Sequence, residues 1–297
     1  MTLYFISSLC CFDARSLEVG EMGEIVEIDP ETEVSTETFV ETAPVLTLES
    51  QDTAEGDSYS LTVNYSSIFY GPALKGGDIG YVPHPDGGSD FEKPIQMKHF
   101  LGLGMDINRD LSVAAVTYFL WQPLNQERWA TYDPYLKMSH ERIVQMGNFK
   151  LYADLRFHVP VSESSREAHL QGGLQSVQVA TYDAPDSRWT FNLYGSARTN
   201  FFGKKGYGSD LELYLGPNVV YQLAPTVGLT LLYEMSGSHR YGDKPGILRN
   251  DGTDLEPGVT WDVTPRLNVN PYLNFYPGNR LAWDTTSVGM LLNWKLL

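Results

Sequence analysis

The sequence contains no run of eighteen apolar residues, and this absence excludes a membrane-spanning helix. It does not exclude a membrane protein built from strands, because the apolar residues of a β-barrel alternate with polar ones. Ala, Glu and Lys do not gather in long periodic blocks, whereas the chain holds 18 Tyr and 27 Gly. This composition favours strands and tight turns, so we interpret the chain as mainly β.

Cysteine is nearly absent, since Cys10 and Cys11 are the two that the sequence contains. They adjoin each other, and a disulfide between neighbouring residues would be strained, so no disulfide is expected. They lie in a short apolar run that is followed by small residues at Ala14 and Ser16. Although no basic residue precedes the run, this pattern predicts a signal peptide over residues 1–16.

Basic residues are missing from residues 17–58, which carry 13 acidic side chains and account for most of the net charge of −16. This segment is poor in aromatics and cannot bury enough apolar surface to order itself. We predict an acidic, disordered, flexible segment: a solvated spacer, a contact segment, or, in a β-barrel, a tail that reaches into the lumen. Residues 59–297 are near charge balance, with 23 acidic and 20 basic side chains. No nucleic-acid partner is therefore expected.

Motifs for cofactors and metals are also lacking. No zinc-type His-Glu spacing and no dinucleotide-binding glycine pattern occurs. The segments 86–92 and 250–256 are rich in Asp and Gly and could present carboxylates to calcium, but neither has the ligand order of a calcium loop. Turn chemistry explains both. We expect no metal, no cofactor and no catalytic residue.

From residue 59 onward, apolar and polar residues alternate with a period of two. Residues 149–158 show this best, because Phe, Leu and Ala alternate there with Lys, Tyr, Asp, Arg and His. A similar pattern recurs in twelve segments, of which the fourth is the least regular because Asp133 is followed by Pro134, which removes a ladder donor. The predicted strands are 59–70, 97–107, 111–121, 132–140, 147–158, 172–182, 188–199, 209–223, 226–236, 256–264, 266–276 and 284–297.

Short and long connections alternate between these segments. Tight turns such as 108–110 and 224–225 separate longer, polar, Gly-rich stretches at 71–96, 122–131, 159–171, 200–208, 237–255 and 277–283. Outer-membrane barrels have this asymmetry, and an even strand count returns both chain ends to one side. The expected fold class is all-β, a transmembrane antiparallel up-and-down β-barrel of twelve strands. A soluble sandwich, whose apolar faces turn inward, is the alternative.

The last segment carries the spacing polar-x-Gly-x-x-hydrophobic-x-hydrophobic at Ser287, Gly289, Leu292 and Trp294. This motif resembles the signal by which barrel-assembly machinery recognises its clients, although the chain finishes with Leu296 and Leu297 rather than an aromatic residue. Over residues 59–297 the chain resembles the Gram-negative outer-membrane β-barrel class and is porin-like. The resemblance implies a location in the cell outer membrane, contact with its lipid and lipopolysaccharide, assembly by that machinery, and a periplasmic position for residues 17–58.

Barrels of this size in that class include, as the resemblance implies, oligosaccharide-selective porins, a nucleoside channel, autotransporter pores and a phospholipase. Fold alone does not choose among these functions. The phospholipase pattern has Ser two residues after His, and none of the six histidines is followed by Ser at that spacing. A non-conducting structural or adhesive barrel and an outer-membrane hydrolase stay open as alternatives to a channel.

If the apolar faces meet lipid, the polar faces line a lumen rich in Tyr and Asn through which small polar solutes could diffuse. Opposed charges would orient dipolar solutes, and tyrosine rings would offer surfaces for sugars. Arg198 and Glu212 should be cross-strand neighbours, and the stretch 71–96 could fold inward and constrict the lumen. Alternatively, the charges neutralise one another and fill a narrow lumen. The predicted pore-lining residues are Lys98, Lys150, Tyr152, Asp154, Arg156, His158, Tyr194, Arg198, Glu212, Tyr214, Glu234, Asp262, Tyr272 and Lys295.

Overall fold

A computed structural model describes residues 60–76, 78–84, 89–125, 127–277 and 282–297. All of them belong to one compact unit, Thr36–Leu297. The predicted signal peptide, residues 1–16, and the predicted acidic segment, residues 17–58, lie outside the described residues.

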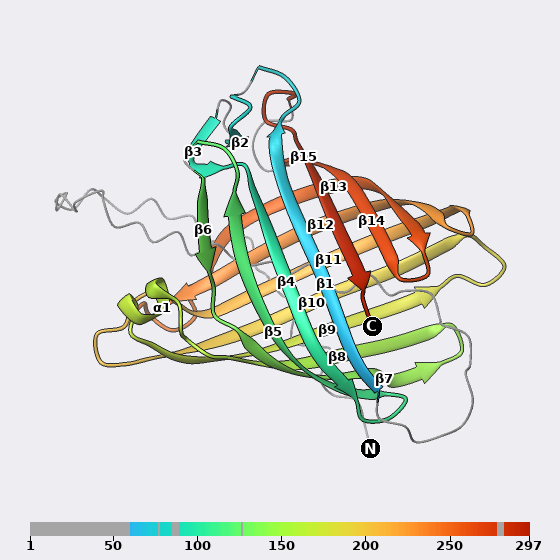
Figure 1. Ribbon diagram of the computed structural model, residues 1–297, viewed down its shortest axis with the longest axis horizontal. Coiled ribbons are helices and arrows are strands. Elements are labelled where there is room, and N and C mark those ends of the chain that lie inside the picture. Colours follow the sequence, from blue (N-terminus) through green and yellow to red (C-terminus); the bar gives the residue numbers. More distant parts are fainter. Residues whose placement is uncertain (1–59, 77, 85–88, 126, 278–281) are drawn as a thin grey trace. The chain divides into compact units, whose positions relative to one another are not determined.

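Twelve strands form a closed antiparallel barrel, which confirms the predicted fold class (Figure 1). Each strand pairs with its neighbours along the chain, and pairing between the first and last strands completes the ring. The barrel strands are β1 (Ser60–Ala73), β4 (Gln96–Asp106), β5 (Leu111–Gln122), β7 (Tyr135–Met146), β8 (Phe149–His158), β9 (Leu170–Asp183), β10 (Trp189–Phe202), β11 (Ser209–Ala224), β12 (Val227–Arg240), β13 (Arg249–Thr264), β14 (Leu267–Asn274) and β15 (Ser287–Lys295).

The connections differ between the two ends of the barrel. At one end, here the short-turn end, strands are joined by turns such as 147–148, 225–226 and 265–266. The opposite, long-loop end carries the remaining elements of the described chain, which are β2 (Tyr81–Pro83), β3 (Ser89–Pro94), β6 (Arg128–Thr131) and α1 (Glu163–Glu167). The predicted alternation of long and short connections is thereby confirmed.

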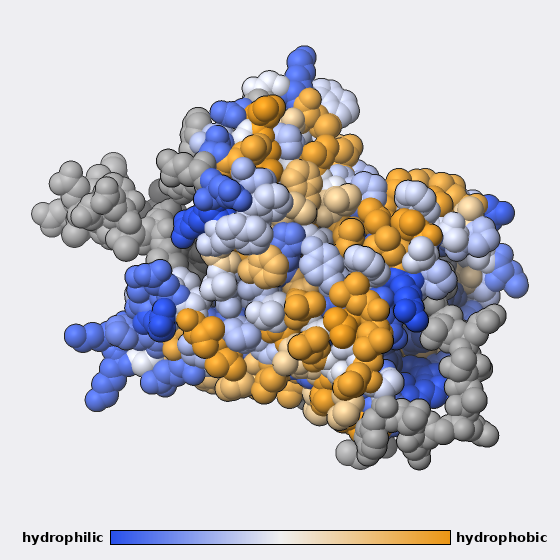
Figure 2. All heavy atoms as spheres, in the orientation of Figure 1, coloured by the Kyte–Doolittle hydropathy of each residue, from blue (hydrophilic) through white to orange (hydrophobic). Residues whose placement is uncertain are grey.

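Residues alternate between the two faces of the barrel wall. On β8, Tyr152 and Asp154 are buried on the inward face, whereas Leu155 and Phe157 are exposed on the outward face. Figure 2 shows hydrophobic side chains gathered over the barrel wall, and the outward face also exposes Trp189, Phe191, Leu193, Leu215, Leu229, Leu231 and Trp261. Apolar residues outside and polar residues inside are the reverse of a soluble sandwich and match a wall that faces lipid.

No helix in the described part of the chain is long and apolar enough to cross a membrane.

Several strands run further at the long-loop end than the sequence predicts. β12 continues to Arg240 and β13 begins at Arg249, within the predicted connection 237–255. In this part of the wall Ser236 pairs with Gly252, so backbone pairing persists after the apolar alternation ends. Hydrophobicity marks where lipid would cover the wall, and it does not mark where hydrogen bonding stops.

The fourth predicted strand, 132–140, is displaced and interrupted. β6 and β7 both pair with β5, but the residues Asp133 and Pro134 separate them. Proline lacks the backbone donor that a continuous ladder needs. The Asp133 carboxylate instead accepts hydrogen bonds from the backbone N–H groups of Val161 and Ser162, both at 2.8 Å, and from the Ser165 hydroxyl. This carboxylate therefore ties the segment that carries α1 to the break in the wall.

The glycine of the closing-strand motif makes room for an aromatic ring. Gly289 of β15 is the cross-strand partner of Tyr272 on β14, and both lie on the inward face. A Cβ atom at Gly289 would overlap the Tyr272 ring. The tyrosine thus packs flat against the backbone of the neighbouring strand.

We expect Gly289→Ala to destabilise the folded barrel by about 1–3 kcal/mol, because the ring must move from a well-packed position. Gly195→Ala is the matched control, since a Cβ atom there meets nothing closer than Gln178 Oε1 at 3.9 Å. The thermal midpoint of the heat-modifiable band on electrophoresis measures both effects. Equal midpoints for the two variants would show that the ring packing contributes nothing.

Candidate functional site: the barrel lumen

All fourteen predicted pore-lining residues lie on the inward face. Residues that are directly opposite on neighbouring strands point to the same face of the sheet. Arg156 is opposite Gln175, Gln175 is opposite Arg198, and Arg198 is opposite Glu212, so all four face inward. The predicted pairing of Arg198 with Glu212 is confirmed. That these inward residues line a conducting pore stays a prediction.

The most enclosed charges of the lumen are on β8. Arg156 and Asp154 are 1% and 3% exposed. The Arg156 guanidinium donates from Nε and Nη2 to the two Asp154 oxygens, over 2.8 and 2.9 Å, and the Tyr152 hydroxyl donates to Asp154 Oδ2 over 2.8 Å. The Tyr152 oxygen also accepts a hydrogen bond from the Ser139 hydroxyl on β7, over 3.2 Å, because its single proton goes to Asp154. This pair is part of the packed wall, and it is not available to a passing solute.

Less deeply buried charges lie on β10 and β11. Arg198 donates from Nε to Asn200 Oδ1 over 2.9 Å, and Asn200 Nδ2 donates to Glu212 Oε1 over 2.8 Å. Both Arg198 and Glu212 are partly exposed. Asn200 therefore links a cation and an anion that are both partly exposed.

Carboxylates dominate the inward face of β12 and β13, which we call the acidic sector and define as Glu234, Asp254 and Glu256. Glu234 accepts a hydrogen bond of 2.7 Å from the Tyr214 hydroxyl and is the cross-strand partner of Asp254. Sequence reasoning missed Asp254, which falls in the predicted loop 237–255, and it also missed Glu256. Glu256 and the predicted Asp262 are an even number of residues apart on β13, and residues at such a spacing point to the same face of a strand. The prediction that Asp262 faces inward could therefore have been extended to Glu256.

An apolar cluster fills another part of the lumen, which corrects the expectation of a polar lining throughout. Its side chains pack together from β1, β4, β5, β7 and β15, and we call it the apolar sector: Ile68, Phe100, Val116, Tyr118, Tyr135 and Leu291. The cause is visible in β5, where Val116, Tyr118 and Leu120 are apolar on the inward face while the outward face is apolar too. Alternation is lost there, so sequence pattern alone could not assign the faces.

The other predicted residues take structural positions in the wall. Lys98 is buried with its Nζ atom 4.9 Å from the centre of the Tyr70 ring. His158 Nε2 lies 2.9 Å from Gln175 Oε1. Tyr194 packs against Tyr152 and Val179, and Tyr272 lies over Gly289. Three further predicted residues lie towards the short-turn end: Lys150, Asp262 and Lys295.

Comparisons with known proteins find similarity in structure but not in sequence. No protein-family model matches the sequence, and no curated protein is similar to it. An outer membrane channel from Pseudomonas putida F1 is similar in structure, with a TM-score of 0.50 and 10% identity over 82% of this chain and 100% of that chain. OmpF of Salmonella typhi in complex with daunomycin also matches, with a TM-score of 0.37 and 9% identity over 81% and 98%. The fold is that of a porin-like outer-membrane β-barrel.

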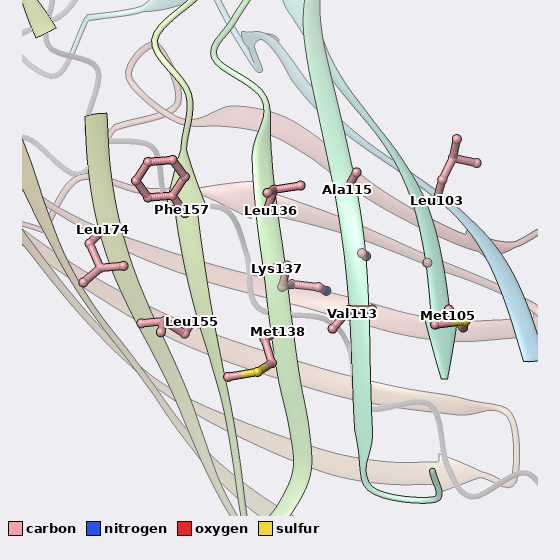
Figure 3. Close-up of a pocket in the computed structure, with 12 residues that line it drawn as sticks. Leu103, Met105, Val113, Ala115, Leu136, Lys137, Met138, Leu155, Phe157 and Leu174 are labelled. Atoms are coloured by element: carbon pink, nitrogen blue, oxygen red, sulfur yellow. The ribbon is translucent and has the colours of Figure 1, made fainter. Parts of the chain in front are cut away.

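The porin-like barrel also has an apolar groove of about 520 Å³, but this groove lies on the outward face (Figure 3). Nine of its lining residues are outward by register: Leu103, Met105, Val113, Ala115, Leu136, Met138, Leu155, Phe157 and Leu174. Ala115 is small between larger neighbours, which leaves the hollow. The groove belongs to the surface that would meet lipid, and it is not part of the lumen.

Metal chemistry finds no support in the described residues of the porin-like barrel. Within the described ranges, no three His, Cys, Asp or Glu side chains converge as a metal site requires.

Proposed function

We propose that this protein is an outer-membrane channel through which small polar solutes diffuse passively. The observation that carries the proposal is the separation of charge on the inward face. Arg198 lies on β10 next to Glu212, and the acidic sector follows on β12 and β13. Opposed charges across water orient dipolar solutes and bias the flow of ions. The similarity in fold to an outer membrane channel supports the same function.

The proposal includes an orientation. The short-turn end would face the periplasm and the long-loop end the outside, as in other outer-membrane barrels. The exposed apolar wall would contact outer-membrane lipid and lipopolysaccharide, and β15 would be recognised by the barrel-assembly machinery. Extraction only by detergent, together with heat-modifiable migration on electrophoresis, tests the location. Release of the folded protein by buffer alone would contradict it.

A non-conducting scaffold is the second candidate, and a specific observation favours it. The buried pair Asp154–Arg156 and the apolar sector fill part of the interior. Smaller barrels are filled by side chains in this way. Reconstitution into planar bilayers separates the two functions, because a channel gives stepwise conductance whereas a scaffold gives none at any voltage.

Neutralising Arg198 should change ion selectivity. Arg198→Gln removes a partly exposed cation from the lumen, so the permeability of cations relative to anions should rise, and Glu212→Gln should lower it. A unit charge at about 4 Å in water is worth about 1 kcal/mol, which is a factor of about five in local ion concentration. Reversal potentials in a salt gradient measure the change. Arg142→Gln is the control, because this arginine bonds Asp110 near the short-turn end. Identical reversal potentials for all three variants would remove the proposed role of these charges.

A further inference from the structure

The lumen also contains the elements of a binding site for organic cations. We propose that the acidic sector binds the ammonium head of such cations and that the partly exposed tyrosine rings beside the apolar sector contact an attached apolar group. This inference rests on the proposed channel function and narrows its substrate class. Among small polar solutes, the barrel would prefer primary ammonium compounds that carry an apolar or aromatic group.

The acidic sector gathers three carboxyl groups on one part of the inward face. Glu234 and Asp254 are cross-strand partners, and Glu256 follows on the same inward face of β13. Glu234 and Glu256 are buried, and their hydrogen bonds come from neutral donors, the Tyr214 hydroxyl and Asn274 Nδ2. Lys93 of β3 interacts electrostatically with Asp254. Neighbouring carboxylates raise the free energy of one another's ionised form when they are taken out of water, and a bound cation relieves this repulsion.

A second observation points to a ligand with hydrogen-bond donors. Asn274 is 7% exposed, and its amide nitrogen is 3.4 Å from Glu256 Oε1. The carbonyl oxygen of the same amide, Asn274 Oδ1, is buried and accepts no hydrogen bond. Asn270 Oδ1, four residues earlier on the inward face of β14, is also buried and accepts no hydrogen bond. Buried acceptors without donors are costly to the fold. An N–H donor that enters beside the carboxylates would satisfy them.

Within the described part of the chain the acidic sector does not have the geometry of a metal site. Among the described residues no metal-type convergence of acidic side chains exists, so these three carboxylates do not surround one point. An ammonium group presents up to three N–H donors in different directions and is larger than a bare divalent ion. It can therefore contact acceptors on β13 and β14 together.

Aromatic and apolar surfaces adjoin the acidic sector. The Tyr272 ring lies flat over Gly289 on the inward face of β14 and β15, and a tyrosine face attracts cations. Leu291 of the apolar sector is the cross-strand partner of Asn270 on one side and of Ile68 on the other. The apolar sector thus begins one strand away from the unsatisfied amides. A ligand with its ammonium among the carboxylates would place its apolar part against the partly exposed rings of Tyr272 and of Tyr70, which packs against the apolar sector.

Binding to the purified full chain in detergent tests the proposal without requiring conductance. The probes are 2-phenylethylammonium, 3-phenylpropionate with a similar body and the opposite charge, and methylammonium, which is the head alone. Isothermal titration should give at least about tenfold tighter binding of 2-phenylethylammonium than of either other probe. The double variant Asp254→Asn/Glu256→Gln should lose this preference, and Glu167→Gln on exposed α1 should keep it.

The outcomes separate this proposal from the channel function. Selective binding without conductance would sink the channel and leave the cation site standing. Conductance combined with equal affinity for the cationic and anionic probes would overturn the cation site, as would a double variant that binds like the natural protein. Should the double variant fail to fold, Glu256→Gln alone preserves shape, and it should weaken binding of 2-phenylethylammonium severalfold.

Discussion

Replacing Asp154 with Ala should destabilise the folded barrel by about 3–5 kcal/mol, because the change leaves the Arg156 guanidinium buried without its carboxylate. Both side chains are nearly inaccessible to solvent, and two charged hydrogen bonds join them. Breaking a buried pair by removing one partner costs more than the pair contributes. Urea unfolding of the detergent-solubilised barrel, followed by tryptophan fluorescence, measures the loss.

The control for this prediction is a pair of the same chemistry in an accessible place. Arg142 donates to Asp110 near the short-turn end, where both side chains are partly exposed. Asp110→Ala should therefore cost only about 0–1 kcal/mol. The double variant Asp154→Leu/Arg156→Met should recover most of the stability, since no unpaired charge remains. If Asp154→Ala and Asp110→Ala have equal effects, the buried pair does not carry the energy assigned to it.

Introducing a charge on the outward face should have the second large effect. Leu231 is exposed on the outward face of β12, four residues from its short-turn end. In a barrel that crosses a bilayer this position lies near the middle of the apolar band, where arginine costs about 2–4 kcal/mol. Leu231→Arg should therefore reduce both the folded fraction in lipid vesicles and the free energy of unfolding.

The adjacent residue supplies the matched control. Thr230 faces inward, as the partner of Val220 and Gly258, so Thr230→Arg places the same charge in the lumen. We expect Thr230→Arg to fold nearly as well as the natural protein. Equal tolerance of both arginines would argue against lipid contact at this wall, whereas strong destabilisation by Thr230→Arg alone would reverse the assignment of faces.

The fold was predictable from sequence wherever one face of a strand is apolar and the other polar. Residues 149–158 alternate cleanly, and β8 occupies that same range, Phe149–His158, within the predicted strand 147–158. The prediction was displaced at residues 132–140, where the strand begins only after Pro134, at Tyr135. The presence of Pro134 in the sequence indicates that the backbone hydrogen bonding of a strand is interrupted there. It does not reveal that Asp133 gains hydrogen bonds from a segment about thirty residues away.

The sequence predicts which face of a strand a side chain lies on, but it does not predict how exposed that side chain is. Parity placed Arg156 and Arg198 inside together, but burial separates them. Arg156 is enclosed by its bonds to Asp154, whereas Arg198 is partly exposed. Burial depends on neighbours from several strands, and a one-dimensional pattern does not contain it. The apolar sector was missed for a related reason, because a strand that is apolar on both faces gives no alternation to interpret.

The pairing of β1 with β15 governs how this ring can form. Asn64 pairs with Lys295, and the backbone N–H of Leu296 donates to the Val63 carbonyl over 2.7 Å. These contacts join residues more than 200 positions apart, so the entropic cost of closing the ring arises when β1 pairs with β15. Until that step both strands present unpaired edges, which readily pair with other chains. A sheet that lacked only the β1–β15 pairing would therefore expose two strand edges, and a holding chaperone could protect it by covering both.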